Sequence, residues 1–307
     1  MIIDHESDGE RNMNLKLLLG PMRLPFLILP PACVLLGLGT AVREIGNVNA
    51  FYFILSLIGA ISAHISVNAF NEYFDFKSGL DFNTKRTPFS GGSGTLPENP
   101  EAARYALITA IVSFFITLSI GVFFLSVWGR DILPIGILGL ITIFCYTPWV
   151  TRNPYLCLLA PGLGFGPLMV MGTHFVLTGE YSISSFIASL IPFFLVNNLL
   201  LLNQYPDTDA DKSVGRKSLP VIRGRRVSSI VFSIFLAMTY ISIVVGIQLG
   251  YLPRISMIGL LTIFIAVPVC IGSFRYADDM GKLIPYMGMN VIINISTPVL
   301  VALGMFF

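Results

Sequence analysis

Long apolar runs separated by short polar segments dominate the pattern along this chain. Nine of these runs approach the roughly 20 residues that an α-helix needs to cross the hydrocarbon core of a bilayer. They cover residues 24–42, 50–71, 103–128, 132–149, 155–178, 183–205, 227–250, 254–274 and 285–306. The pattern therefore predicts an all-α, polytopic membrane protein with nine transmembrane helices.

The composition agrees with this prediction. Of the 307 residues, 54% are hydrophobic and 12% are charged, and the mean hydropathy is +0.78. A soluble domain carries roughly 25% charged residues. The formal net charge of +2 argues against nucleic acid as a partner. The four cysteines lie in apolar runs without the spacing of a metal site, and we interpret them as small core residues.

The basic residues are distributed unevenly between the segments that flank the runs. If the N-terminus faces the cytoplasm, 16 of the 19 lysines and arginines lie on that side, and Arg43, Arg130 and Arg254 lie on the other. Because cytoplasmic loops are enriched in Lys and Arg, a cytoplasmic N-terminus is predicted. Residues 1–22 lack the basic start of a signal peptide and are expected to form a cytoplasmic tail, followed by a single transmembrane domain at 23–307.

One polar segment, NQYPDTDADKSVGRKSLPV at 203–221, follows the sixth run and concentrates charge. Asn203, Asp207 and Asp211 are spaced at i, i+4 and i+8, so they share one face if the segment is helical. Pro206 lies inside the segment and is expected to kink or end the helix near it. The basic residues that follow are Lys212, Arg216 and Lys217.

A second polar segment, NEYFDFKSGLD at 71–81, follows the second run. Asn71 and Asp75 repeat the Asn-x-x-x-Asp spacing, and Asp81 lies just past Gly79. The basic residues that follow are Lys85 and Arg86. Both segments come after even-numbered runs, so we expect them on the cytoplasmic side, facing one central cavity.

Facing clusters of carboxylates repel each other unless cations lie between them. Oxygen ligands favour Mg²⁺, which completes its octahedral shell with water and phosphate oxygens. The neighbouring basic residues suit a polyanionic ligand, and the apolar surroundings suit a ligand with a hydrophobic tail. The sequence contains neither a P-loop nor a Gly-rich dinucleotide motif, which argues against a nucleotide. A diphosphate carried on an apolar chain fits both features.

The two polar segments resemble the two aspartate-rich motifs of the UbiA superfamily of intramembrane prenyltransferases. NEYFDFKSGLD is similar to the first motif of its MenA-type branch, the 1,4-dihydroxy-2-naphthoate polyprenyltransferases, and the segment at 203–221 is similar to the second. Tyr146-Thr147, the run FGPLMVMG at 165–172 and Arg23 at the start of the first span are also similar to family sequence. The resemblance covers most of the chain and implies nine helices around a central cavity.

The resemblance also implies roles for the candidate residues. Mg²⁺ would be held by Asp75, Asp81, Asp207 and Asp211, and three of these, Asp75, Asp207 and Asp211, would be catalytic. Tyr146 would stabilise an allylic cation through its π face. A polyprenyl diphosphate donor would be bound by Arg23, Asn71, Lys85, Arg86, Asn203, Lys212, Arg216 and Lys217. The acceptor would be a small hydrophobic or aromatic molecule, such as a quinone precursor, reached within the membrane lipid.

Two histidines and three asparagines within the apolar runs are further candidates. His64 and His174 are candidates for a proton acceptor or a contact to the acceptor substrate, with a hydrogen-bonded packing role as an equal alternative. Asn68, Asn197 and Asn198 either line the cavity or bond between helices.

Three further acidic residues are expected to play lesser parts. Asp209 points away from the face that carries Asp207 and Asp211 if the segment is helical. Asp278 and Asp279, in the last cytoplasmic segment, are interpreted as solvated loop charges.

Two alternative functions stay open at this point. The same chemistry could serve another lipid acceptor, such as a glycerol phosphate in ether-lipid synthesis. An ion-coupled transporter would also place carboxylates in a membrane protein, but transporter sites usually lie near the bilayer midplane in broken helices. In this chain the acids are expected on loops at one membrane face, which disfavours transport.

Overall fold

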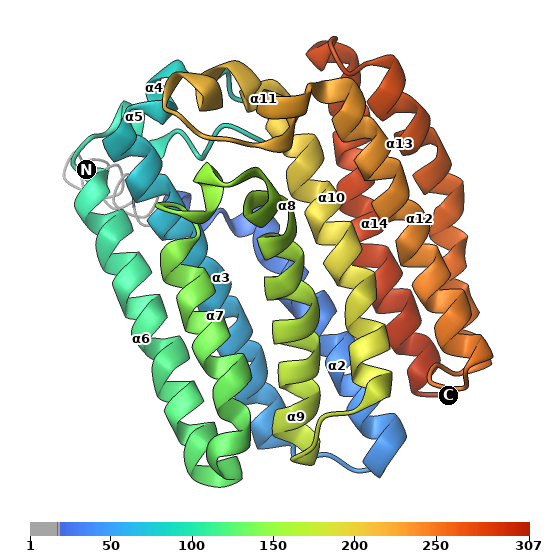
Figure 1. Ribbon diagram of the computed structural model, residues 1–307. Helices are drawn as coiled ribbons and strands as arrows, with labels where there is room; N and C mark the ends of the chain where they lie inside the picture. The colour runs from blue at the N-terminus through green and yellow to red at the C-terminus, as the bar shows by residue number, and fades with distance from the viewer. Residues whose placement is uncertain (1–16, 18) are drawn as a thin grey trace, which may run out of the picture.

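The computed structural model describes Leu17 and residues 19–307, so most of the predicted tail, with its acidic residues, lies outside the described residues. Every regular element in the described part is a helix (Figure 1). The helices of the bundle are α2 (Leu29–Ile45), α3 (Ala50–Ser78), α6 (Ala102–Trp128), α7 (Leu133–Cys145), α8 (Pro154–Leu163), α9 (Gly172–Thr178), α10 (Ile183–Ser213), α12 (Arg225–Gln248), α13 (Ile263–Arg275) and α14 (Met280–Met305). Three short helices, α4 (Leu80–Asn83), α5 (Thr95–Glu98) and α11 (Leu219–Arg223), lie between them.

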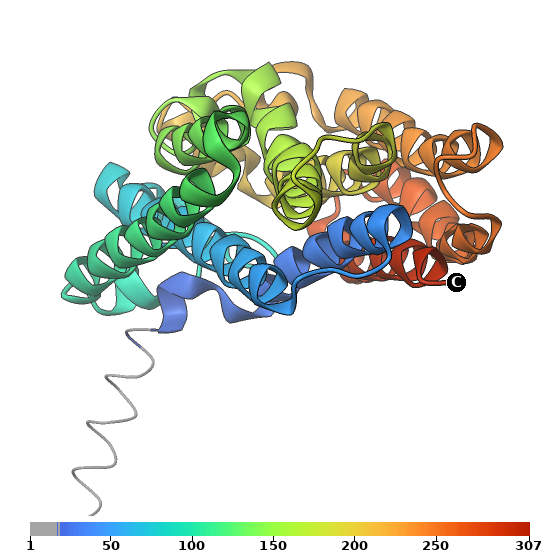
Figure 2. The ribbon, with the colours of Figure 1, turned by 90° about the horizontal axis from the view of Figure 1, so that it is seen from below.

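The described helices cross the membrane nine times. Eight helical segments are long and apolar enough to span a bilayer. One of them, Ala102–Cys145, has 44 residues, about twice the length that one crossing needs. It folds back at Gly129–Ile132, and α6 and α7 lie side by side in both views (Figures 1 and 2). Counted as two crossings, this segment gives the predicted nine.

Both acidic segments are continuations of long helices, which corrects the expectation that they lie on loops. α3 runs on to Ser78 and is ended by Gly79, whose φ of 79° is left-handed and whose amide donates to the carbonyls of Asp75 and Phe76. α10 runs through Pro206 to Ser213, so the helix does not end near this proline. Tyr205 anchors the helix there, because its buried hydroxyl donates to the carbonyl of Arg225 at 3.0 Å.

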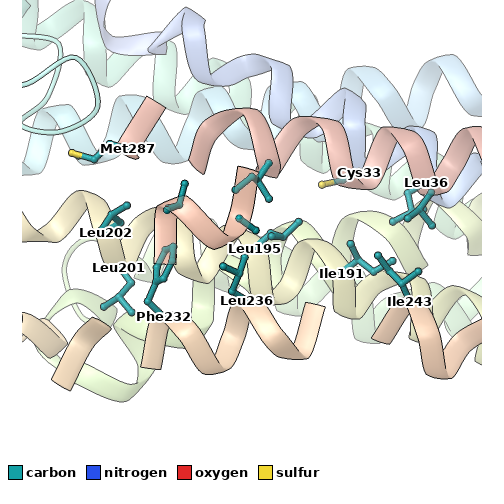
Figure 3. Close-up of a cluster of buried hydrophobic side chains, with 14 of the residues drawn as sticks. Cys33, Leu36, Ile191, Leu195, Leu201, Leu202, Phe232, Leu236, Ile243 and Met287 are labelled. Carbon is teal, nitrogen blue, oxygen red and sulfur yellow. The ribbon is translucent and has the colours of Figure 1, made fainter. Parts of the chain in front are cut away.

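The packing differs between the two sides of the bundle. One side is a core of buried apolar side chains in which α10 packs against α12 and α14, with Leu195, Phe232 and Leu236 near its middle (Figure 3). The outward faces carry exposed residues such as Phe115 and Phe264, as expected for helices that contact lipid. The chain is an integral membrane protein, and its other side encloses a cavity.

Candidate active site

A cavity of about 600 Å³ lies between α2, α3, α6, α7, α8, α9 and α10. Most of its wall is apolar, contributed by residues such as Leu125, Ile135 and Leu168. The charged residues of the lining lie at or near the C-terminal ends of α3 and α10, which lie toward the top of the view in Figure 1. Nine predicted site residues line the cavity: Arg23, Asn71, Asp75, Asp81, Tyr146, Asn203, Asp207, Asp211 and Arg216. The space therefore has one charged end and a long apolar body.

The second acidic segment presents one helical face to this space. Asn203, Asp207 and Asp211 all line the cavity from the last three turns of α10. Their i, i+4 and i+8 spacing requires this arrangement once the helix continues past Pro206. Asp209, between them, is exposed and lies off the cavity.

Arg216 joins the two acidic segments. Its guanidinium contacts the carboxylate of Asp75 and lies 3.6 Å from that of Asp211. The chain turns back after α10 at Gly215, whose φ is 77°, and the Arg216 amide donates to the Asp211 carbonyl at 3.0 Å. Asp75 of α3 and Asp211 of α10 are thus held together by one guanidinium.

Arg23 is anchored on α3 beside the first acidic segment. Its Nε donates to Glu72 at 2.7 Å and its Nη2 donates to Asn71 at 3.0 Å. Glu72 is fully buried and also accepts hydrogen bonds from the amide and hydroxyl of Ser93, both at 2.8 Å. Sequence reasoning missed Glu72. The signal was present, because Asn68, Glu72 and Asp75 follow at i, i+4 and i+7 and so form one stripe of α3.

The segment 84–95 lies across the charged end of the cavity. Gly91 and Gly92, with φ of 84° and 72°, line it with backbone. A Cβ on Gly92 would lie 3.2 Å from Glu72 Oε1 and 3.3 Å from Asp81 Oδ1. Glycine is therefore required there both for its left-handed φ and for the close approach of backbone to the carboxylates.

The charged end has an excess of negative charge. Five buried or half-buried carboxylates (Glu72, Asp75, Asp81, Asp207 and Asp211) face two guanidiniums, which leaves three charges unbalanced. Burial, and then the nearby charges of Asp75 and Glu72, raise the pKa of Asp81 to about 7. A bound cation would relieve this repulsion.

The unpaired oxygens fit a divalent cation that shares its shell with a ligand. Asp81 Oδ2, Asp207 Oδ1 and Asn203 Oδ1 are buried and have no hydrogen-bond partner among the described residues. Within the same part of the chain, no three His, Cys, Asp or Glu residues lie close enough to hold one ion by themselves. Mg²⁺ typically takes one or two carboxylates and completes its shell with water and phosphate oxygens.

Comparison with known proteins identifies the family. The model of the UbiA prenyltransferase family matches residues 29–291. The chain belongs to this family. It is a prenyltransferase, as the two aspartate-rich segments predicted, and this membership decides against the transporter alternative.

Similar proteins include two enzymes with different acceptors. The chain is 27% identical to the 1,4-dihydroxy-2-naphthoate octaprenyltransferase of Bacillus subtilis, over 69% of this chain and 67% of that protein. It is 28% identical to the digeranylgeranylglyceryl phosphate synthase of Pyrococcus horikoshii, over 74% of this chain and 79% of that protein.

Solved structures share the fold of this prenyltransferase. A UbiA homologue from Aeropyrum pernix superposes with a TM-score of 0.70 at 16% identity, covering 92% of this chain and 97% of that one. A homologue from Archaeoglobus fulgidus, solved with GPP and Mg²⁺, has a TM-score of 0.60 at 15% identity and covers 93% of this chain and 99% of that one. The all-α fold of the described residues is thereby confirmed.

Four of the predicted donor-binding residues lie away from the cavity of this prenyltransferase. Lys85, Arg86, Lys212 and Lys217 are exposed and do not line it. Arg86 instead pairs with Glu98 at 3.0 Å. A direct role for these four stays a prediction, and the arginines that do line the cavity are Arg23 and Arg216.

The asparagines considered from sequence have different surroundings. Asn68 lines the cavity, and its amide donates to the carbonyl of Met22 at 3.1 Å. Asn197 accepts from the amide of Gly162 at 2.6 Å, and Asn198 donates to the carbonyl of Phe232 at 2.8 Å. The last two bond between helices, outside the cavity lining.

The acidic pair in the last polar segment also lies outside the cavity lining. Asp278 is 3.3 Å from Arg225 and Asp279 is 2.9 Å from Lys282. Both acidic side chains are exposed, as expected for solvated loop charges.

Proposed function

We propose that this prenyltransferase moves a prenyl group from a polyprenyl diphosphate to an aromatic acceptor within the membrane, in a reaction that depends on Mg²⁺. The observation that supports this most is the meeting of two acidic segments and two arginines at one end of an otherwise apolar cavity. That division suits a donor with a charged head and a hydrocarbon tail.

The donor head would bind between Arg23 and Arg216. Both guanidiniums line the cavity together with the acidic residues and suit diphosphate oxygens as charge-assisted donors. Glu72 and Asn71 fix the position of Arg23 through two hydrogen bonds. Arg216, which contacts Asp75 in the unliganded chain, would share its charge with the donor.

Asp75, Asp81, Asp207 and Asp211 would hold the metal, with Asn71 and Asn203 beside them. Bound Mg²⁺ would supply positive charge that stabilises the diphosphate as it leaves. The unpaired oxygens of Asp81 and Asp207 support this assignment. A homologue from A. fulgidus with the same fold was solved with GPP and Mg²⁺, which supports Mg²⁺ as the cation.

The reaction would break the bond between C1 of the donor and its diphosphate oxygen, and the leaving group would keep the electron pair. The apolar wall excludes water from the allylic cation. Tyr146, which lines the cavity, would stabilise this cation with its ring. A carbon of the acceptor ring would then bond to C1, and the ring would release a proton.

We propose 1,4-dihydroxy-2-naphthoate as the acceptor, which would place the chain in menaquinone biosynthesis. The B. subtilis relative acts on this compound by name, and the aspartate-rich segments have the form of its branch. The P. horikoshii relative makes a glyceryl phosphate ether lipid by name, so a glyceryl phosphate is the second candidate acceptor.

We also propose that the charged end of the cavity faces the cytoplasm. The uneven distribution of the basic residues supports this orientation, with 16 of 19 on one side. Lys85→Cys and Lys212→Cys should react with an impermeant maleimide only from the cytoplasmic side, and Arg254→Cys only from the other. Labelling of the first two positions from opposite sides would contradict the proposal.

The decisive experiment combines purified protein in lipid nanodiscs with prenyl diphosphates of several lengths and both candidate acceptors. Mass spectrometry should detect prenylated naphthoate when Mg²⁺ is present and none after excess EDTA. Product formed only with glyceryl phosphate would support the second acceptor. Undiminished turnover in EDTA would contradict the metal dependence.

A further inference from the structure

His64 is a buried polar residue in the cavity that the reaction described above does not use. It lies on α3, lines the cavity and is 8% exposed. Its Nδ1 is buried and has no hydrogen-bond partner among the described residues. Phe165 packs edge-on against its ring, with the centroids 4.9 Å apart and the planes at 88°, and fixes its orientation. Ionisable side chains inside a membrane protein usually have a functional partner.

The position of His64 separates it from the diphosphate site. His64, Asn68, Asn71 and Asp75 are spaced by four, three and four residues and line the cavity from one face of α3. At 1.5 Å per residue, His64 lies about 16 Å from Asp75 and about 10 Å from Asn71 along the helix axis. It therefore lies two to three turns of helix from the carboxylates that would hold the metal, toward the apolar body of the cavity.

An unpaired ring nitrogen at this depth needs a polar partner from the ligand. The hydrocarbon tail of a prenyl donor offers no hydrogen bond, and packing it against an unpaired nitrogen costs free energy. The nearest polar group along the same face, the amide of Asn68, already donates to Met22. The remaining ligand of the reaction is the acceptor, which carries oxygen substituents.

We propose that His64 hydrogen-bonds an oxygen substituent of the acceptor ring, away from the carbon that is prenylated, and thereby selects the acceptor. This inference rests on the proposed function. A neutral imidazole has one donor and one acceptor nitrogen, so it can bind a hydroxyl or a carboxylate. A ring without that oxygen would leave the histidine unpaired and would be discriminated against.

The test is a comparison of Michaelis constants for the two substrates in His64 variants. His64→Phe keeps an aromatic ring against Phe165 and removes both nitrogens, and His64→Leu provides a second variant without nitrogen. In both, KM for the acceptor should rise about 10- to 100-fold, as expected for a lost hydrogen bond to a polar or charged group. KM for the prenyl diphosphate should stay unchanged, and His64→Gln should restore most of the acceptor affinity.

His174 provides a matched control. It is also a buried histidine, but it does not line the cavity. Its Nδ1 is 3.0 Å from the Thr40 hydroxyl, and its Nε2 is 3.6 Å from Glu44. His174→Phe should lower the thermal unfolding midpoint and leave KM for the acceptor unchanged.

Acceptor analogues identify the oxygen that His64 contacts. One analogue lacks the carboxylate and another lacks a hydroxyl; KM for one of the two should be the same in the wild type and in His64→Phe. An unchanged acceptor KM in His64→Phe and His64→Leu, or equal dependence on His64 for both analogues, would overturn the inference. A wild-type protein that transfers no prenyl group to any aromatic acceptor would instead overturn the proposed function.

Discussion

α3 and α10 carry the same Asn-x-x-x-Asp spacing but are supported in different ways. α10 lies inside the bundle, and its buried residues are largely apolar side chains such as Leu195, Leu201 and Leu202 that pack toward α12 and α14. α3 exposes large residues such as Phe51 and Ile54 on its outer face. Its buried side chains are mostly polar.

This difference separates two ways of orienting a carboxylate. On α10 the apolar core fixes the orientation of the helix, and this orientation determines which way its acidic side chains point. On α3 the acids are oriented by polar neighbours: Arg23 and Ser93 bond Glu72, and Arg216 contacts Asp75. Substitution of a residue that supports α10 should therefore mainly lower the free energy of unfolding. Substitution of a residue that supports α3 should mainly lower the rate of prenyl transfer.

The largest expected effect tests whether the two helices serve one site. Asp75→Ala on α3 and Asp207→Ala on α10 should each reduce prenyl transfer by roughly 10²- to 10³-fold, because each removes charge that stabilises the leaving diphosphate. Thermal unfolding midpoints should change little, since one of several repelling carboxylates is lost. Rates are measured with saturating donor and Mg²⁺.

The control for this pair is Asp278→Ala. Asp278 lies outside the cavity lining and its side chain is 73% exposed, so its loss should leave the rate near that of the wild type. A large loss of prenyl-transfer rate in only one of Asp75→Ala and Asp207→Ala would contradict this prediction, because the two helices would then not share a reaction centre.

A smaller effect is expected from the polar support of α3. Glu72→Gln keeps the shape of the side chain but removes the charge that holds Arg23. Hydrogen bonds to charged groups contribute about 1.5–3 kcal/mol, so activity should fall by roughly tenfold or more, with a higher KM for the prenyl diphosphate. The thermal unfolding midpoint should also fall, because Glu72 is fully buried and loses charged hydrogen bonds. A drop in the midpoint with normal kinetics would contradict this assignment.

A residue that supports α10 should affect the stability of the protein and not its activity. Tyr205 is fully buried, and its hydroxyl contacts the carbonyl of Arg225 and the hydroxyl of Ser229. Tyr205→Phe should lower the free energy of unfolding by about 1 kcal/mol and leave kcat nearly unchanged. Chemical denaturation and kinetic assays on the same preparation would check both quantities.

The sequence predicted those features that depend on local spacing. Nine apolar runs gave the crossings, and the four-residue repeats placed the acids of α3 and α10 on faces that line one cavity. Both follow from the helical period and the thickness of a bilayer.

Features that depend on tertiary contacts could not be predicted in this way. The continuation of α10 through Pro206 depends on packing around Tyr205, and the burial of Glu72 depends on its pairing with Arg23. Among the basic residues, composition alone did not distinguish Arg216, which turns into the cavity, from Lys212, which is exposed. That difference arises from the turn at Gly215.

The smallest expected effect tests whether the second acidic segment is helical. Asp209 lies two residues from both Asp207 and Asp211, so it belongs to the opposite side of α10, and it is exposed. Substitution of an exposed side chain usually changes free energies by no more than about 0.5 kcal/mol, so Asp209→Ala should keep its rate within about twofold of the wild type. The three single alanine variants of Asp207, Asp209 and Asp211 form a scan along the helix, in which a strong, weak, strong pattern is expected. An Asp209→Ala variant as inactive as its neighbours would mean that this stretch is not helical when the donor is bound.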